Sequence, residues 1–205
     1  MTRIKICGLT RPCDIDAVNG ERPDYIGFVF ADSRRRVTPA QALELRGRLA
    51  EGIVPVGVFV DDTVDDVAAL VEAGVIEIAQ LHGSETEAYI RALKARIDKP
   101  VIKAVSFETL NNPEWARQDR KWQNTCADYL LFDSGPGGTG RSFDWGMIGR
   151  IGKPFFLAGG LHMGNVAAAI AAVQPFAVDI SSSVETDGLK DREKIKEIIR
   201  RVRNA

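Results

Sequence analysis

Short apolar runs recur along the whole chain at nearly even spacing, and this repeat limits the possible folds more than any other feature. Eight runs can be counted, and their starts lie about 21–29 residues apart. They are Ile4–Cys7, Tyr25–Phe30, Val54–Val60, Ile76–Leu81, Val101–Val105, Tyr129–Phe132, Phe155–Ala158 and Ala177–Ile180. Runs this short and this apolar are typical of strands buried on both faces, as in a parallel sheet.

Segments with helical periodicity lie between these runs. Thr38-Pro39 begins one helix with proline at its first position, and Thr63-Val-Asp-Asp begins another that Gly74 ends. The pattern predicts further helices near Asp14–Asn19, after Ser84, over Asn111–Gln123, over Asn165–Val173 and over Leu189–Val202.

Eight strands that alternate with about eight helices have two solutions, an open doubly wound sheet and a closed (βα)₈ barrel. The strand count, the even spacing and the lack of a GxGxxG motif after the first strand favour the barrel. A length of 205 residues is near the lower limit for this fold. We therefore predict a single α/β domain over residues 1–205, a (βα)₈ TIM barrel with short loops.

Composition excludes several classes of protein. The chain has 27 Lys and Arg against 28 Asp and Glu, so nothing in its charge suggests nucleic-acid binding. No apolar run approaches the roughly 18–20 residues that cross a bilayer, and the first residues do not resemble a signal peptide. The chain has three cysteines, Cys7, Cys13 and Cys126, and no two of them form a CxxC motif. We therefore expect neither a disulfide framework nor a zinc site. These features predict a cytoplasmic protein without nucleic-acid or membrane partners.

In a barrel of this class the active site forms at the carboxyl ends of the strands. Gly159 and Gly160 follow the seventh strand, and Ser181 and Ser182 follow the eighth. Backbone N–H groups and hydroxyls at these two loops predict a phosphate site, although the glycines could simply form tight turns. The glycine-rich stretch 134–140 is interpreted as a lid, and it lacks the GK[ST] ending of a nucleotide P-loop.

Two residues at strand ends are candidates for proton transfer. Cys7 ends the first strand, where a thiolate could act as a base, although a lone strand cysteine is commonly only a small buried residue. Asp133 follows the apolar run YLLF, and a buried carboxyl group can stay protonated and donate a proton near neutrality. The alternative is that Asp133 only caps the loop after it.

Other polar residues near strand ends are more ambiguous. One arginine of Arg34–Arg36 could bind a substrate carboxylate, or all three could form a solvated cluster. His82 could transfer protons or only pack at a strand end, and His162 is expected to be exposed. Asp61 and Asp62 fit a helix N-cap before Thr63 better than a metal site.

Motifs at nearly every strand end resemble one known family. They are Lys5-Ile-Cys-Gly-Leu-Thr10, Gly27-Phe-Val-Phe30, Val56-Gly-Val-Phe-Val60, Gln80-Leu-His-Gly83, Asp133 with Gly137-Gly-Thr-Gly140, Phe143-Asp-Trp145, Leu157-Ala-Gly-Gly-Leu161, Asn165-Val166 and Val178-Asp-Ile-Ser-Ser182 with Val184-Glu185. In collinear order from about residue 3 to 193, they resemble phosphoribosylanthranilate isomerase of tryptophan biosynthesis. The chain departs from the family pattern at two places. His162-Met163 replaces the usual Asn-Pro, and Ser183 replaces the usual glycine.

The resemblance implies a TIM barrel that catalyses an Amadori rearrangement without a cofactor or metal. The substrate is N-(5-phosphoribosyl)anthranilate and the product is 1-(2-carboxyphenylamino)-1-deoxyribulose 5-phosphate. By this resemblance Cys7 is the general base, Asp133 the general acid and Arg35 the ligand of the anthranilate carboxylate. We also expect His82 and Asp179 to bind the substrate, and the loops at Gly159-Gly160 and Ser181-Ser182 to bind its phosphate.

Two other functions remain open from the residues alone. One is a different phosphate-binding barrel, such as a sugar-phosphate epimerase or the related histidine-pathway isomerase, which use metals or paired aspartates. The other is a non-catalytic barrel that senses a phosphorylated metabolite. A candidate acid together with a candidate base favours an enzyme, because binding alone needs neither. The sequence does not indicate an oligomeric state.

Overall fold

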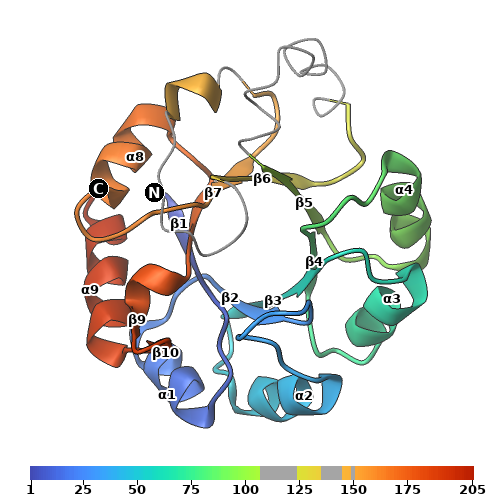
Figure 1. The fold of residues 1–205 in the computed structure, drawn as a ribbon, viewed down its shortest axis with the longest axis horizontal. Coiled ribbons are helices and arrows are strands. Elements are labelled where there is room, and N and C mark those ends of the chain that lie inside the picture. Colours follow the sequence, from blue (N-terminus) through green and yellow to red (C-terminus); the bar gives the residue numbers. More distant parts are fainter. Residues whose placement is uncertain (107–123, 135–144, 149–150) are drawn as a thin grey trace.

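The computed structural model describes residues 1–106, 124–134, 145–148 and 151–205, and in this part eight parallel strands close into a barrel (Figure 1). Each strand is hydrogen-bonded to the next, and β8 pairs with β1. The strands are β1 (Arg3–Cys7), β2 (Tyr25–Val29), β3 (Val54–Phe59), β4 (Ile78–Leu81), β5 (Val101–Ser106), β6 (Tyr129–Asp133), β7 (Phe155–Leu157) and β8 (Ala177–Ile180). The predicted barrel is therefore confirmed, and the open sheet is excluded.

All eight predicted strands are present, and their ends differ from the prediction by at most two residues. The largest shift is at β4, which begins at Ile78 rather than Ile76. The backbone amides of Val75 and Ile76 both bond to the carbonyl of Leu70, so these residues complete the turn after a helix before the strand can start.

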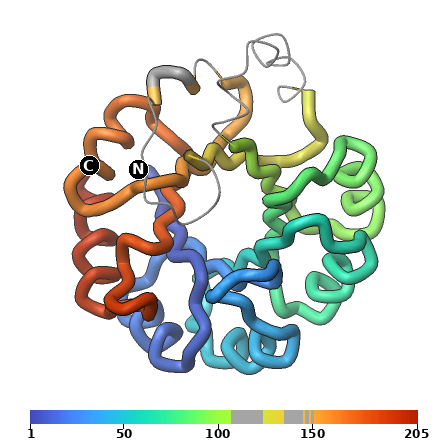
Figure 2. Tube along the Cα trace, viewed as in Figure 1, coloured from blue at the N-terminus to red at the C-terminus, as the bar shows by residue number. Residues whose placement is uncertain are grey.

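Six α-helices of the described chain lie outside the ring of strands (Figure 1). They are α1 (Pro12–Glu21), α2 (Pro39–Arg48), α3 (Val64–Glu72), α4 (Glu87–Arg96), α8 (Val166–Val173) and α9 (Arg192–Arg203), with short 3₁₀ helices η1 (Trp145–Ile148) and η2 (Ser182–Val184). The chain runs once around the barrel, so α9 returns beside α1 (Figure 2). The predicted helix over residues 111–123 lies outside the described residues, as does the predicted lid after Ser134.

Helix capping explains where α2 and α3 begin. The side chain of Thr38 accepts a hydrogen bond from the amide of Gln41, and that of Thr63 accepts one from the amide of Asp66. The prediction that Asp61 and Asp62 cap α3 is wrong, because Thr63 itself is the cap. The carboxylate of Asp61 turns away to Ser84, whose amide and hydroxyl lie 2.7 and 2.8 Å from its Oδ1.

Two predicted helices have different bounds in the structure. The first is longer than predicted, because α1 starts at Pro12 and the carboxylate of Asp14 accepts bonds from the amides of Thr10 and Arg11. The last is shorter, because Leu189–Lys190 forms strand β10, which pairs with β9 (Glu185–Thr186) in an antiparallel hairpin. Asp191 then caps α9 by accepting bonds from two amides.

Apolar side chains fill both sides of the barrel wall. Outward-facing strand residues pack against the helices in one large core. Inward-facing residues form a second core at the amino-terminal end, where Phe156 makes edge contacts with Tyr25 and Tyr129, and Arg3 lies over the ring of Phe176. This end is closed by side chains, so polar groups inside the barrel lie toward the carboxyl ends of the strands. Among the described helices, none has the length and apolar character needed to span a membrane.

Candidate active site

A cavity of about 410 Å³ opens at the carboxyl ends of the strands. All nine residues that the sequence predicts for the site line it, namely Cys7, Arg35, His82, Asp133, Gly159, Gly160, Asp179, Ser181 and Ser182. The exposed His162 also lies at its edge. Residues from six of the eight strand ends thus meet in one place, which is the location expected for a barrel enzyme.

Two glycines make room for Cys7 and its neighbour Arg35. Cys7 pairs in register with Gly27 on β2, and a Cβ at Gly27 would lie 2.6 Å from the sulfur of Cys7. Gly8 has a φ of +84°, and a Cβ there would lie 2.4 Å from Cδ of Arg35. The missing side chains therefore let the thiol enter the barrel and let the stem of Arg35 cross beside it.

A buried ion pair between Lys5 and Asp179 lies in the barrel close to the thiol of Cys7. Lys5 is two residues before Cys7 on β1, and its Nζ lies 2.7 Å from Oδ2 of Asp179 on β8. Burial opposes the charge on Lys5, but Asp179 and Cys7 outweigh it, and the pKa of Lys5 is raised. Burial raises the pKa of Cys7, and the charges of Lys5 and Lys190 offset part of this effect. The thiol is thus the resting form, and its thiolate is a stronger base than an exposed one.

A chain of polar contacts crosses the barrel from this ion pair to the candidate acid. Lys5 Nζ also lies 2.9 Å from Oε1 of Gln80, and Nε2 of Gln80 lies 3.0 Å from Nδ1 of His82. On the other side of the imidazole, Nε2 of His82 lies 3.4 Å from Oδ2 of Asp133. The Asp133 side chain is only 12% exposed. Asp133 therefore sits at the end of β6 with one oxygen toward His82.

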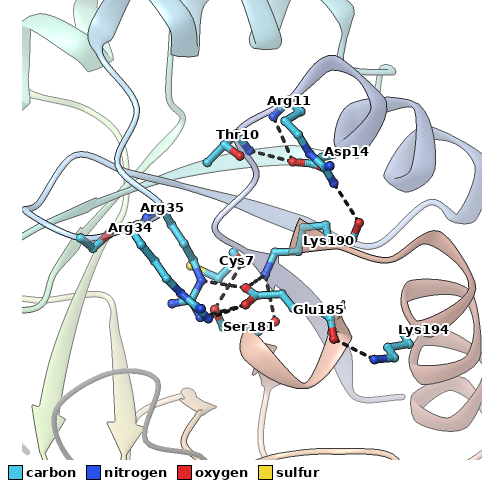
Figure 3. A network of polar contacts seen from close by, with 11 residues as sticks. Cys7, Thr10, Arg11, Asp14, Arg34, Arg35, Ser181, Glu185, Lys190 and Lys194 are labelled. Carbon is cyan, nitrogen blue, oxygen red and sulfur yellow. Dashed lines mark hydrogen bonds and ion pairs between the residues drawn. The ribbon is translucent and has the colours of Figure 1, made fainter. Parts of the chain in front are cut away.

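Glu185 joins three cations beside the thiol (Figure 3). Its Oε1 lies 2.7 Å from Nε of Arg35 and 2.8 Å from Nζ of Lys190, and its Oε2 lies 2.6 Å from Nη2 of Arg34. Burial disfavours the carboxylate, but hydrogen bonds from Arg35 and Lys190 outweigh it and lower the pKa of Glu185. Three positive charges share one carboxylate here, so the cluster has an excess positive charge suited to an anionic ligand.

Two arginines of the predicted cluster, Arg34 and Arg35, lie in different environments. Arg35 is 14% exposed in its side chain and lines the cavity, whereas Arg34 is 60% exposed. Both Nε and Nη2 of Arg35 bond to Glu185, so its position is held before any ligand arrives.

The two predicted phosphate loops have backbone conformations that favour anion binding. Gly159 and Gly160 both have left-handed φ angles, +82° and +61°, and a Cβ at Gly159 would lie 2.4 Å from the amide nitrogen of Ser134. Ser182 is the first residue of η2, so its amide lies at a helix start. In the described part of the chain, no hydrogen bond occupies the amides of Gly159, Gly160 or Ser182.

Several polar residues of the site were not predicted. In the sequence, Lys5 and Gln80 are members of motifs without a predicted role. Both are polar residues inside apolar strands, which is a usable signal. Glu185 and Lys190 approach the site through the β9–β10 hairpin, and no spacing in the sequence indicates that approach. Among the described residues no group of three or more His, Cys, Asp or Glu is arranged to hold a metal ion.

Comparison with known proteins gives a consistent result. Residues 4–201 match the family model described as N-(5'phosphoribosyl)anthranilate (PRA) isomerase. The chain is 44% identical to the N-(5'-phosphoribosyl)anthranilate isomerase of Endomicrobium trichonymphae, and the match covers 100% of both chains.

Solved structures show the same similarity in three dimensions. The phosphoribosyl anthranilate isomerase from Thermotoga maritima superposes with a TM-score of 0.88 at 33% identity, with complete coverage of both chains. A phosphoribosyl anthranilate isomerase in complex with reduced 1-(o-carboxyphenylamino)-1-deoxyribulose 5-phosphate gives a TM-score of 0.84 at 32% identity, also with complete coverage.

Proposed function

This chain belongs to the family of N-(5'-phosphoribosyl)anthranilate isomerases, and from that premise we propose that Cys7 is the general base and Asp133 the general acid of its reaction. The reaction is the Amadori rearrangement of N-(5-phosphoribosyl)anthranilate to 1-(2-carboxyphenylamino)-1-deoxyribulose 5-phosphate in tryptophan biosynthesis. The observation that carries the residue assignment is that Cys7 and Asp133 line one cavity from β1 and β6.

The first step needs an acid. Opening of the ribose ring places a proton on the ring oxygen, and Asp133 donates that proton to become a carboxylate. Its position at the end of β6, on the wall of the cavity and beside His82, supports this role. Nε2 of His82 lies 3.4 Å from Oδ2 of the carboxylate that remains.

The second step needs a base. Ring opening leaves a Schiff base, which makes the proton at C2′ acidic, and the thiolate of Cys7 removes this proton. The enolamine then tautomerises to the ketone. Lys5 supports this assignment, because a buried cation beside the sulfur favours the thiolate and its charge is itself held by Asp179.

The two ends of the substrate are both anionic, and each has a suitable partner. We assign the anthranilate carboxylate to Arg35, which Glu185 holds at the cavity wall beside Cys7. We assign the phosphate to the amides and hydroxyls of the loops at Gly159-Gly160 and Ser181-Ser182. His82 and Asp179 also line the cavity, and we assign them to the ribose part.

The experiment that tests this function is a turnover assay on the purified protein. The anthranilate fluorescence of the substrate falls when it is converted, so a non-catalytic sensor would bind it without continuous loss of signal. We expect multiple turnovers without added metal or cofactor, including in the presence of a chelator. Binding without turnover would favour the sensor, and turnover that a chelator abolishes would favour a metal-dependent barrel enzyme.

Partners and location follow from the chemistry of the substrate. A phosphorylated small molecule is the expected ligand, since a related structure holds such a compound. A substrate with phosphate and carboxylate groups does not cross a bilayer unaided, which supports a cytoplasmic enzyme. Recovery of the protein in the membrane fraction of lysed cells would contradict this location.

A further inference from the structure

Gln80 lies inside the barrel between two groups whose roles are already described. It is buried, and its side-chain amide connects Lys5 on β1 to His82 just beyond β4. Lys5, the buried cation next to the thiol, contacts Oε1 at 2.9 Å, and His82, the neighbour of the acid, contacts Nε2 at 3.0 Å. Gln80 also lines the cavity, but its side-chain amide has no titratable proton, so it is not itself an acid or base of the reaction.

The donors and acceptors of these contacts permit one arrangement. The ammonium group of Lys5 can only donate, so the group of Gln80 that faces it must be the carbonyl oxygen. The NH₂ group of Gln80 therefore faces His82, and it too can only donate. Nδ1 of His82 must then accept a hydrogen bond and carries no proton, which places the proton of the neutral imidazole on Nε2.

From this arrangement we infer that Gln80 is a positioning residue, anchored by Lys5, that fixes His82 in the tautomer with its proton on Nε2, the ring nitrogen that lies toward Asp133. Nε2 lies 3.4 Å from Oδ2 of Asp133, a distance that ligand binding can shorten. Once the two atoms come within hydrogen-bond distance, the N–H donates to Oδ2 and the acidic proton of Asp133 is on Oδ1. After that proton leaves, the same N–H stabilises the carboxylate. This consequence for the reaction rests on the proposed role of Asp133, whereas the tautomer itself does not.

The tautomer can be observed directly by ¹⁵N nuclear magnetic resonance of the imidazole rings. The chain has two histidines, and exposed His162 supplies the reference signals, which a His162→Asn variant assigns. The spectra are recorded well above the ordinary titration range of imidazole. We expect His82 to show an unprotonated Nδ1 and a protonated Nε2. A protonated Nδ1 in the wild-type protein would overturn the inference.

Two variants separate positioning from packing. Gln80→Glu keeps the shape but presents only acceptors to both neighbours, so Nδ1 of His82 must gain a proton and the spectrum must change. Gln80→Met keeps the volume and removes the hydrogen bonds, so the two tautomers should mix. We expect kcat to fall about 10–100-fold in Gln80→Glu with a smaller change in KM, as for loss of a group that orients a functional side chain.

The outcomes distinguish this inference from the proposed function. If Gln80→Glu folds and leaves both the His82 spectrum and kcat unchanged, Gln80 does not set the tautomer. If stability falls equally in both variants while the spectrum stays as in the wild type, its role is only structural. A wild-type spectrum as expected, together with an active Asp133→Asn variant, would keep the tautomer and remove Asp133 as the acid.

Discussion

The thiol of Cys7 occupies the space that a side chain at Gly27 would fill. The two residues are register partners on β1 and β2, and a Cβ added to Gly27 would lie 2.6 Å from Sγ and 3.1 Å from Cα of Cys7. The second contact is with backbone, so rotation of the thiol alone cannot relieve it. The position of the proposed base thus depends on the absence of a side chain on the neighbouring strand.

Gly27→Ala should therefore displace the thiol and impair the reaction. Overpacking of this kind costs about 1–3 kcal/mol of stability, and displacement of a reacting group by about 1 Å can cost on the order of 10²-fold in rate. We expect kcat to fall by about that factor, measured by the fluorescence assay.

Gly57→Ala is the matched control for crowding. Gly57 lies on β3, and its Cβ would lie 2.7 Å from Ile76 and 2.8 Å from Phe59 in the outer core, not beside Cys7. It should lose stability without a comparable loss of kcat. Equal losses of kcat in the two variants would show that crowding in general, and not the position of the thiol, limits the rate.

Cys7→Ser should reduce activity by about 10²–10⁴-fold, because a hydroxyl is far too weakly acidic to provide an equivalent base. Alkylation of Cys7 should inactivate the enzyme, and substrate should protect it. Cys13 on α1 and Cys126 before β6 are internal controls whose replacement by serine should leave the rate largely intact. Full activity after selective modification of Cys7 would remove it from the mechanism.

The pH dependence of Cys7 alkylation should report the thiol. Because the pKa of Cys7 is raised and only the thiolate is alkylated, the alkylation rate, measured in a variant with serine at positions 13 and 126, should rise with pH and level off only above the ordinary titration range of a thiol. Lys5→Met removes a cation that lowers this pKa, so the rising limb should move to still higher pH.

Lys103→Met controls for the loss of a buried lysine. Lys103 on β5 lies 2.6 Å from Glu85, and both side chains are almost completely buried, but neither lines the cavity. This variant should lose stability and keep the wild-type pH profile. An unshifted profile in Lys5→Met would show that Lys5 does not act on Cys7.

Gly160→Val should weaken phosphate binding, because a branched side chain at a left-handed φ of +61° distorts the loop whose amides face the cavity. Phosphate contacts act equally in ground and transition states, so KM should rise more than kcat falls, and inhibition by inorganic phosphate should weaken in parallel. Gly74→Val, at φ +68° after α3, supplies equal backbone strain far from the site. A wild-type inhibition constant for phosphate in Gly160→Val would place the phosphate elsewhere.

The sequence predicts the barrel well because the signal is local and repeated. Each strand is an apolar run whose burial on both faces follows from its composition, and eight repeats leave few topologies. Strand ends in turn predict the location of the candidate site, so Cys7, Asp133 and the two loops proposed to bind phosphate were expected near one another, and all of them line the cavity.

The contacts that surround these residues could not be predicted in the same way. Lys190 lies opposite Glu185 because Asp187 and Gly188, both with positive φ angles, turn the chain into the β9–β10 hairpin, where periodicity predicted a helix from Leu189. The contact of Lys5 with Asp179 closes the barrel across 174 residues. Long-range pairs of this kind depend on closure and register, which a single sequence does not display.

The proposed roles of Asp133 as the acid and Cys7 as the base are tested most directly at Asp133. Asp133→Asn keeps the shape of the side chain and removes the transferable proton, so kcat should fall by about 10²–10⁴-fold. Affinity for the product should change little, since binding does not require that proton. The decisive measurement is kcat of this variant together with the dissociation constant of the product. A large loss of kcat with retained product binding is the predicted result, and a near-wild-type kcat would contradict the assignment of Asp133.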